Sequence, residues 1–270
     1  MAIITRITTQ KKNQDRFNLY LDHGKGEEYA FSVDSDVLIK FELKKGMEID
    51  ELSIYEIQFQ DDIRKAYNLS IQYLARRMRS EKEVSDYLIK KDVEEPIIKE
   101  VLHKLANQKY INDEDFALAF VRTQVNTTDK GPDLIKQELK EKGVAEDLIS
   151  RALAAYSSEL QLEKAVKLSQ KFFSKSSMES QKIQKQKLEQ ILLRKGYPFG
   201  IIHLAVEELQ GNGAEEEFSA IQYQGAKAHR KFFQYSGFEY EQKMKQALYR
   251  KGFSMELIEK YIASLNREEY

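Results

Sequence analysis

Clusters of cations are the residues of this 270-residue chain whose types and spacing could do chemistry. Guanidinium and ammonium groups bind phosphates and carboxylates, so recurring clusters favour a polyanionic partner. In the last turn of a helix the same cations complement the helix dipole, and this purely structural role stays open for pairs that end helices. The clusters are Arg76, Arg77 and Arg79; Lys90 and Lys91; Lys140 and Lys142; Lys182, Lys185 and Lys187; Arg194 and Lys195; His229, Arg230 and Lys231; and Arg250 and Lys251.

Motifs for enzyme chemistry are missing from the sequence. It has no phosphate-binding or dinucleotide-binding glycine motif, no G-x-S-x-G, no Cys, and four scattered His. The acidic run Asn112 to Asp115 offers oxygen ligands for a metal, but a helix N-cap with an acidic first turn explains it better. We therefore predict a binding protein without catalytic residues, metal or cofactor.

The charge balance changes along the chain. The total is 43 basic against 44 acidic residues, which by itself disfavours a nucleic-acid partner. Residues 1–62 hold 8 basic and 13 acidic residues, a net charge of −5, whereas residues 159–200 hold 9 and 4, a net charge of +5. Residues 63–158 carry +1 and residues 201–270 carry −2. A neutral total therefore hides an acidic N-terminal region and a basic third quarter.

Targeting signals are also missing. The first residues become polar too early for a signal peptide. No apolar run approaches the roughly 18–20 residues that span a bilayer. We expect a soluble, cytoplasmic protein with no membrane partner, and the lack of Cys fits a reducing compartment.

Residues 1–62 predict a small α/β domain. Residues 2–9 are β-branched, and residues 17–21 and 29–33 alternate apolar with polar side chains, which predicts a β-hairpin or three-stranded antiparallel sheet. Residues 23–26 form the turn between two of these strands. Residues 34–36 offer N-caps for a helix that Lys45 and Gly46 end, and a further short element covers residues 49–59.

A pattern that recurs four times fills the rest of the chain. It centres on Lys91, Lys142, Lys195 and Lys251, which lie 51, 53 and 56 residues apart. Apolar residues at the same offsets predict a helix that ends at Lys-Gly, a turn, and a second helix with one apolar face. The predicted core positions are Leu88, Leu139, Leu192 and Leu248; Val93, Val144, Tyr197 and Phe253; Ile98, Ile149, Ile202 and Ile258; Leu102, Leu153, Val206 and Ile262; and Leu105, Tyr156, Leu209 and Leu265.

An upstream amphipathic stretch completes each unit, at residues 66–79, 116–124, 165–173 and 226–233. We therefore predict a mainly α fold, an elongated solenoid of tandem three-helix repeats behind the small α/β domain. The expected boundaries are 1–62, 63–111, 112–158, 159–211 and 212–270. Phe172, Phe173, Phe232 and Phe233 are expected to pack between repeats, although aromatic rings at such sites can also stack on bases.

Several segments resemble the RecX family of bacterial regulatory proteins. They are Tyr73 to Val84, Tyr110 to Ala117 with Phe120 to Arg122, and Lys130 to Val144. The resemblance is dense from residue 66 to residue 156 and fainter beyond. It implies a monomeric modulator that binds the RecA recombinase and the RecA–DNA filament, and restrains ATP hydrolysis, strand exchange and the SOS response. Arg122 joins the clusters above as a candidate contact.

Two other functions stay open. The chain could bind single-stranded or double-stranded DNA alone and act by competition, or it could be a helical adaptor with another partner. A DNA-binding protein would show a steep dependence on salt. We predict that charge reversal at Arg76, Arg77 and Arg79 weakens partner binding without unfolding the protein.

Overall fold

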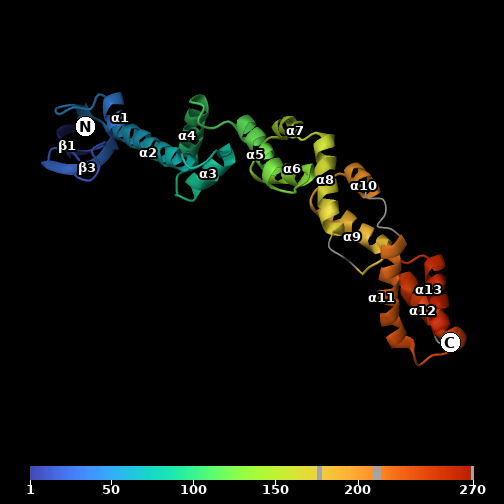
Figure 1. Cartoon of the computed structure of the whole chain (residues 1–270). Coiled ribbons are helices and arrows are strands. Elements are labelled where there is room, and N and C mark those ends of the chain that lie inside the picture. The colour runs from blue at the N-terminus through green and yellow to red at the C-terminus, as the bar shows by residue number, and fades with distance from the viewer. Residues whose placement is uncertain (175–177, 209–213, 269–270) are drawn as a thin grey trace. The chain divides into compact units, whose positions relative to one another are not determined.

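A computed structural model describes residues 1–174, 178–208 and 214–268 (Figure 1). The predicted core position Leu209 and the predicted boundary between residues 211 and 212 lie outside these residues. Within the described chain, no helix combines the length and the apolar character needed to cross a membrane.

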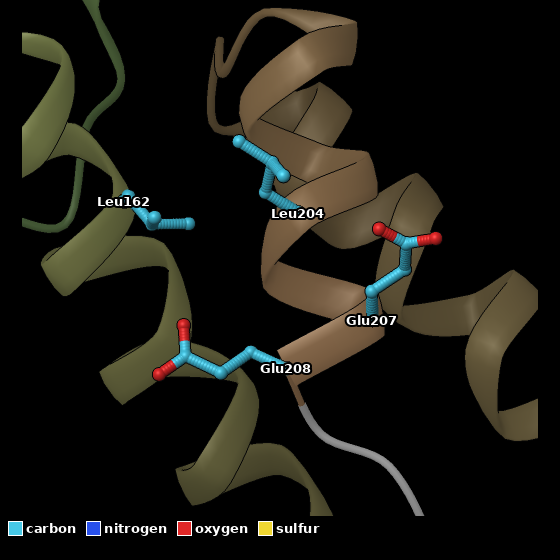
Figure 2. Close-up of a pocket in the computed structure, with 4 residues that line it drawn as sticks. All are labelled: Leu162, Leu204, Glu207 and Glu208. Atoms are coloured by element: carbon cyan, nitrogen blue, oxygen red, sulfur yellow. The ribbon is translucent and has the colours of Figure 1, made fainter.

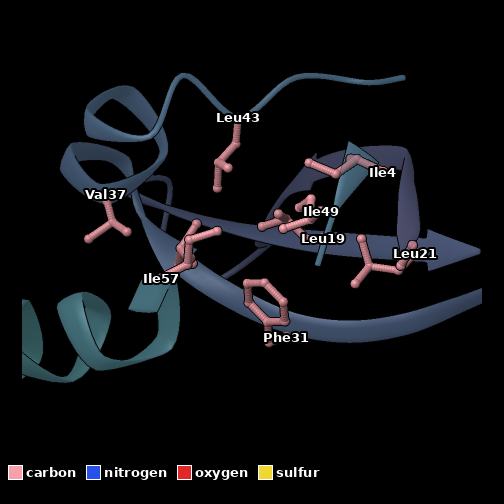
Figure 3. Packing of buried hydrophobic residues seen from close by; sticks show 10 residues of the cluster. Ile4, Leu19, Leu21, Phe31, Val37, Leu43, Ile49 and Ile57 are labelled. Atoms are coloured by element: carbon pink, nitrogen blue, oxygen red, sulfur yellow. The ribbon is translucent and has the colours of Figure 1, made fainter. Parts of the chain in front are cut away.

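An antiparallel sheet of four strands forms the N-terminal part. The strands are β1 (Ala2–Thr9), β2 (Arg16–Asp22), β3 (Glu27–Asp34) and β4 (Glu48–Ile49), in the order β3-β2-β1-β4. The three longer strands confirm the predicted sheet. The two-residue strand β4, which pairs Ile49 with Ala2, was not predicted because alternation cannot be read over two residues. Side chains such as Ile4, Leu19 and Phe31 fill the core beside the sheet (Figure 3).

The helix α1 (Ser35–Lys40) follows β3, and the Asp34 side chain caps it by accepting the Asp36 N–H, as predicted. The predicted end at Lys45 and Gly46 is wrong, because the helix stops at Lys40. Gly46 instead forms a turn with a φ of 85° and donates its N–H to the Ile4 carbonyl at 2.8 Å. The glycine therefore positions β4 and does not cap a helix.

The long helix α2 (Glu51–Leu74) links the sheet to the first repeat. It replaces two predicted elements, at residues 49–59 and 66–79, and it runs through the predicted boundary at 62/63. Ile57 packs in the core of the sheet, whereas Ala66 and Tyr67 pack with the first repeat. Asp61, which is buried, accepts the Asp34 N–H at 2.7 Å and pairs with Arg16 at 2.8 Å, so that it fixes α2 to the sheet.

The remaining helices follow in threes. The first repeat adds α3 (Glu81–Ile89) and α4 (Glu95–Asn107) to α2. The second contains α5 (Asp113–Thr127), α6 (Pro132–Glu141) and α7 (Glu146–Leu153). The third contains α8 (Ser158–Phe173), α9 (Gln181–Arg194) and α10 (Phe199–Glu208), and the fourth α11 (Ala214–Phe232), α12 (Gly237–Arg250) and α13 (Met255–Glu268). The exact limits of the repeats stay a prediction.

Most of the predicted core positions are confirmed as buried, whereas Val93, Leu102, Leu153 and Leu265 are only partly buried. The four Leu that precede the pivot lysines are at most 1% exposed, and the four Ile that follow are at most 4% exposed. Phe172, Phe173 and Phe232 are partly buried against the core of their own repeats, so the prediction that they pack between repeats is wrong. Phe233 is 70% exposed.

The chain divides into two compact units. The first contains Met1–Ala117 and Lys140–Leu148, and the second contains Leu118–Leu139 and Ile149–Tyr270. Residues of the second repeat therefore belong to both units.

Candidate partner-binding surfaces

In the first unit, the turn after α6 lies against the start of α3. Ser80 caps α3 by accepting the Glu83 N–H at 3.2 Å, and its hydroxyl donates to the Lys142 carbonyl at 2.8 Å. The Lys82 ammonium donates to the Glu141 carbonyl at 3.0 Å. The carbonyl end of one helix thus meets the N–H end of another, where the helix dipoles attract each other.

The second unit repeats this contact twice. At the start of α6, the Gly131 N–H donates to the Lys195 carbonyl at 2.7 Å, and the Asp133 N–H donates to the Gly196 carbonyl at 3.0 Å. At the start of α9, the Ser180 hydroxyl donates to the Lys251 carbonyl at 2.5 Å. The Lys-Gly turn of each later repeat therefore docks on the middle helix of the preceding repeat.

Glycine at these turns has two functions. Gly143, Gly196 and Gly252 have φ values of 80°, 81° and 86°, which confirms the predicted helix-ending conformation. A Cβ on Gly196 would lie 2.5 Å from the Leu134 nitrogen. The first function, ending the helix in a left-handed conformation, was predicted from the sequence. The second, allowing close approach to the preceding repeat, was not predicted. The first repeat has Asp92 instead of Gly at the same place.

Two acidic side chains accept hydrogen bonds beside these contacts, and the sequence did not single them out for this role. The Asp113 carboxylate accepts the Glu81 N–H at 2.8 Å, and the Glu217 carboxylate accepts the Gln181 N–H at 2.8 Å. Burial raises the pKa of both carboxyl groups despite these hydrogen bonds. The neighbouring Asn112 caps α5 by accepting the Glu114 N–H at 2.9 Å, as predicted.

The arginine cluster at residues 76–79 is not uniformly exposed. Arg77 pairs with Glu83 at 2.7 Å, and Lys142 lies 3.4 Å from the same carboxylate. Burial tends to raise the pKa of Glu83, but Arg77, the Ser80 N–H and Lys142 together hold it below its ordinary value. The structure thus gathers three of the sequence candidates, Arg77, Arg79 and Lys142, around one carboxylate.

Arg79 is packed and not a free surface cation. Its side chain is 14% exposed, and its guanidinium carbon lies 4.1 Å from the centre of the Tyr73 ring. Tyr73 in turn stacks on Tyr87 with the ring centres 4.1 Å apart. Charge reversal at Arg79 would place a carboxylate against an aromatic ring, so the structure opposes the expectation that reversal of the whole cluster leaves the fold intact. Arg76 is exposed.

The other candidate cations fall into three groups. Lys140 pairs with Glu146 at 2.8 Å, and Lys187 pairs with Glu179 at 2.6 Å. Two ammonium groups lie over aromatic rings, Lys91 over Tyr87 and Lys231 over Phe232. Within the described part of the chain, the remaining cations form no ion pair: Lys90, Arg122, Lys182, Lys185, Arg194, Lys195, Arg230, Arg250 and Lys251.

Lysines of one repeat lie beside the docked turns of the next. A Cβ on Gly252 would lie 3.4 Å from the Lys182 Cβ, so Lys182 lies beside the turn that carries Arg250 and Lys251. A pocket of about 300 Å³ there is lined by Glu179, Ser180, Ile183, Gln224, Arg250 and Lys251. Lys82 occupies the corresponding place beside Gly143. The sequence did not select Lys82, although it follows Ser80 as Lys182 follows Ser180.

An acidic groove between α8 and α10 was also missed. One hollow, of about 450 Å³, is lined by Leu162 of α8 and by Leu204, Glu207 and Glu208 of α10. Figure 2 shows the two leucines on facing helices, with Glu208 extending from the end of α10 toward α8. The third repeat, whose sequence is the most basic, therefore has an acidic face as well.

Docked three-helix repeats behind a small sheet domain define a helical-repeat protein. Family models for RecX match it in order: the regulatory protein RecX N-terminal domain at residues 2–50, the first three-helix domain at 66–105, the second at 112–153, and the third at both 159–206 and 215–262. The chain belongs to the RecX family of regulatory proteins.

Individual relatives agree with this assignment. The regulatory protein RecX of Geobacillus sp. (strain WCH70) is 47% identical over 98% of both chains, and that of Bacillus subtilis (strain 168) is 45% identical over the whole of both. A crystal structure of a regulatory protein RecX matches 77% of this chain and all of its own, with 37% identity and a TM-score of 0.68. The RecX structure from Lactobacillus salivarius matches 56% of this chain and 97% of its own, with 40% identity and a TM-score of 0.53.

Proposed function

We propose that this protein regulates the RecA recombinase by binding RecA and its nucleoprotein filament. The binding would restrain ATP hydrolysis, strand exchange and the co-protease activity of the SOS response. The observation that carries the proposal is the similarity over the whole chain to proteins named regulatory protein RecX. The protein would act as a monomer in the bacterial cytoplasm, where the filament forms.

The proposed mechanism is distributed binding without catalysis. Within each unit, backbone contacts at the Lys-Gly turns hold neighbouring repeats together. Exposed cations recur along the chain, Arg76 in the first unit and Lys182 and Arg250 in the second. A target that repeats, such as a filament, can engage several of these cations at once, and each contact raises the effective concentration of the next. A protein that bridges adjacent filament subunits would oppose their exchange and their conformational cycling.

A titration of RecA ATPase on single-stranded DNA tests the proposal. We expect the wild-type protein to inhibit a preformed filament when present at fewer molecules than RecA. Arg76→Glu combined with Lys182→Glu should weaken this inhibition, because both cations are exposed and form no ion pair within the described residues. Glu100→Lys, at an exposed site on α4, is the control for a change of charge. No inhibition at any ratio would refute the proposal.

Direct competition for DNA is the second candidate. It is favoured by two cations from different repeats near one docked turn: Arg250 lines the pocket that contains Ser180, and Lys182 lies beside Gly252. Binding of DNA alone should weaken steeply as salt increases, because each neutralised phosphate releases a counterion. Inhibition that appears only when the protein is in excess over free DNA sites would favour competition over filament binding.

A further inference from the structure

The groove between α8 and α10 is long enough for a helical segment. A second hollow of about 570 Å³ adjoins the one described above and shares Leu162 and Glu208 with it. The α8 side chains that line it recur at helical spacing from Glu159 to Gln170. At 1.5 Å per residue, these 11 steps correspond to roughly 16 Å, about three helical turns. Val166 and Leu162 give the groove an apolar floor.

The rim of this groove is negative. Glu159, Glu163, Glu207 and Glu208 surround it, and Lys167 is the single cation among the residues that line it in the described chain. Hydrogen bonds from its own N–H and from the Ser157 hydroxyl lower the pKa of Glu159, so this carboxyl is ionised at neutral pH. Carboxylates repel phosphates, and the groove is therefore unsuited to nucleic acid.

The fourth repeat has different side chains at the same place. The two repeats are offset by 56 residues, so that Phe218 corresponds to Leu162 and Lys260 corresponds to Leu204. Phe218 packs against the core of the fourth repeat, and the Lys260 ammonium lies 5.9 Å from the centre of its ring. Leu162 also packs against the core of its own repeat, so the two repeats differ in the residues at these positions: a ring and a cation in the fourth repeat, two leucines in the third.

We infer that the α8–α10 groove binds a cationic amphipathic helix of a protein partner. Apolar side chains of that helix would sit between Leu162 and Leu204, and its lysines or arginines would reach the four glutamates. This is helix-in-groove recognition, with the charge of the rim selecting a basic ligand. The identity of the partner as a filament protein rests on the proposed function; the chemistry of the groove does not.

The test fills the groove with the residues of the fourth repeat. Leu162→Phe with Leu204→Lys reproduces a pair that this fold already accommodates, and Glu100→Lys serves as the control for charge. The first probe is a labelled 14-residue amphipathic peptide of leucine and lysine. We expect the double variant to bind it at least tenfold more weakly than the wild type and the control do. Equal binding by all three proteins would overturn the inference.

The second probe is the RecA filament on single-stranded DNA, with DNA alone as a parallel measurement. We expect the double variant to lose affinity for the filament and to keep its affinity for DNA. Wild-type affinity of the double variant for the filament would overturn the assignment of this groove to the filament. If the wild type does not bind the filament, the proposed function is wrong, and the peptide measurement still tests whether the groove binds a cationic helix. If the double variant proves unstable, Glu207→Gln with Glu208→Gln replaces it.

Discussion

Gly196→Ala tests whether the docked turns hold the repeats together. Gly196 has a φ of 81°, a conformation that costs an L-residue roughly 1–2 kcal/mol. The added Cβ would also lie 2.5 Å from the nitrogen and 2.8 Å from the Cβ of Leu134. These atoms cannot move without separating α6 from the turn, and such overpacking costs about 1–3 kcal/mol more. We therefore expect a total destabilisation of roughly 2–5 kcal/mol.

Two other glycines separate the two costs. Gly46 has a similar φ of 85°, and Gly237 lies in the same unit with a φ of 55°; neither would place a Cβ within 4 Å of another atom. Alanine at either site should cost only the strain of an L-residue at positive φ, roughly 1–2 kcal/mol. The comparison isolates the close approach of the turn to α6.

Urea unfolding and native-state hydrogen exchange measure the effect. Because the chain has two units, local exchange is more informative than one global free energy. The amides of Gly131 and Asp133, which donate to the docked turn, should lose protection in Gly196→Ala and keep it in Gly237→Ala. If Gly196→Ala is no more destabilising than Gly46→Ala, and both amides stay protected, the turn does not hold the repeats together.

Three further predictions concern the first unit. Arg76→Glu should leave the melting temperature equal to that of the wild type within error. Arg79→Glu should lower the free energy of unfolding by about 2–4 kcal/mol, because it buries a negative charge beside Tyr73. Equal melting curves for the two variants would contradict this prediction. Glu83→Gln should cost about 1–3 kcal/mol at pH 7. The pKa of Glu83 is lowered in the folded protein, so the ionised carboxylate stabilises the fold above its unfolded pKa of about 4.3, and this stabilisation disappears as the pH falls. A difference in unfolding free energy between the wild type and Glu83→Gln that does not change with pH, measured with urea, would contradict this prediction. Asp113→Asn should behave in the opposite way. The pKa of Asp113 is raised in the folded protein, so ionisation of its carboxyl group costs stability as the pH rises. The variant should therefore be at least as stable as the wild type at pH 7 and equally stable below about pH 3. A loss of stability on this substitution at pH 7 would show that the Asp113 charge is favourable.

Part of the candidate surface was predictable, and the rest was not. The sequence places the cations, because charge clusters are visible in one dimension. It does not reveal that Arg79 packs on Tyr73 or that Lys142 pairs with Glu83, since those partners are chosen by packing. The acidic groove left a weak signal in the helical spacing of Glu159 and Glu163. Its open floor became visible only when α8 and α10 were placed side by side.

The sequence by itself determined the local features of this protein. Buried Leu and Ile positions follow from helical periodicity, and helix starts follow from caps such as Asp34 and Asn112, because these preferences act within a few residues. The tertiary structure decided which ends meet. Ser80 contacts Lys142, 62 residues away, and Ser180 contacts Lys251, 71 residues away. No local preference encodes such a pairing; it arises because each repeat buries its remaining surface, and the free groups at its helix ends, against the next one.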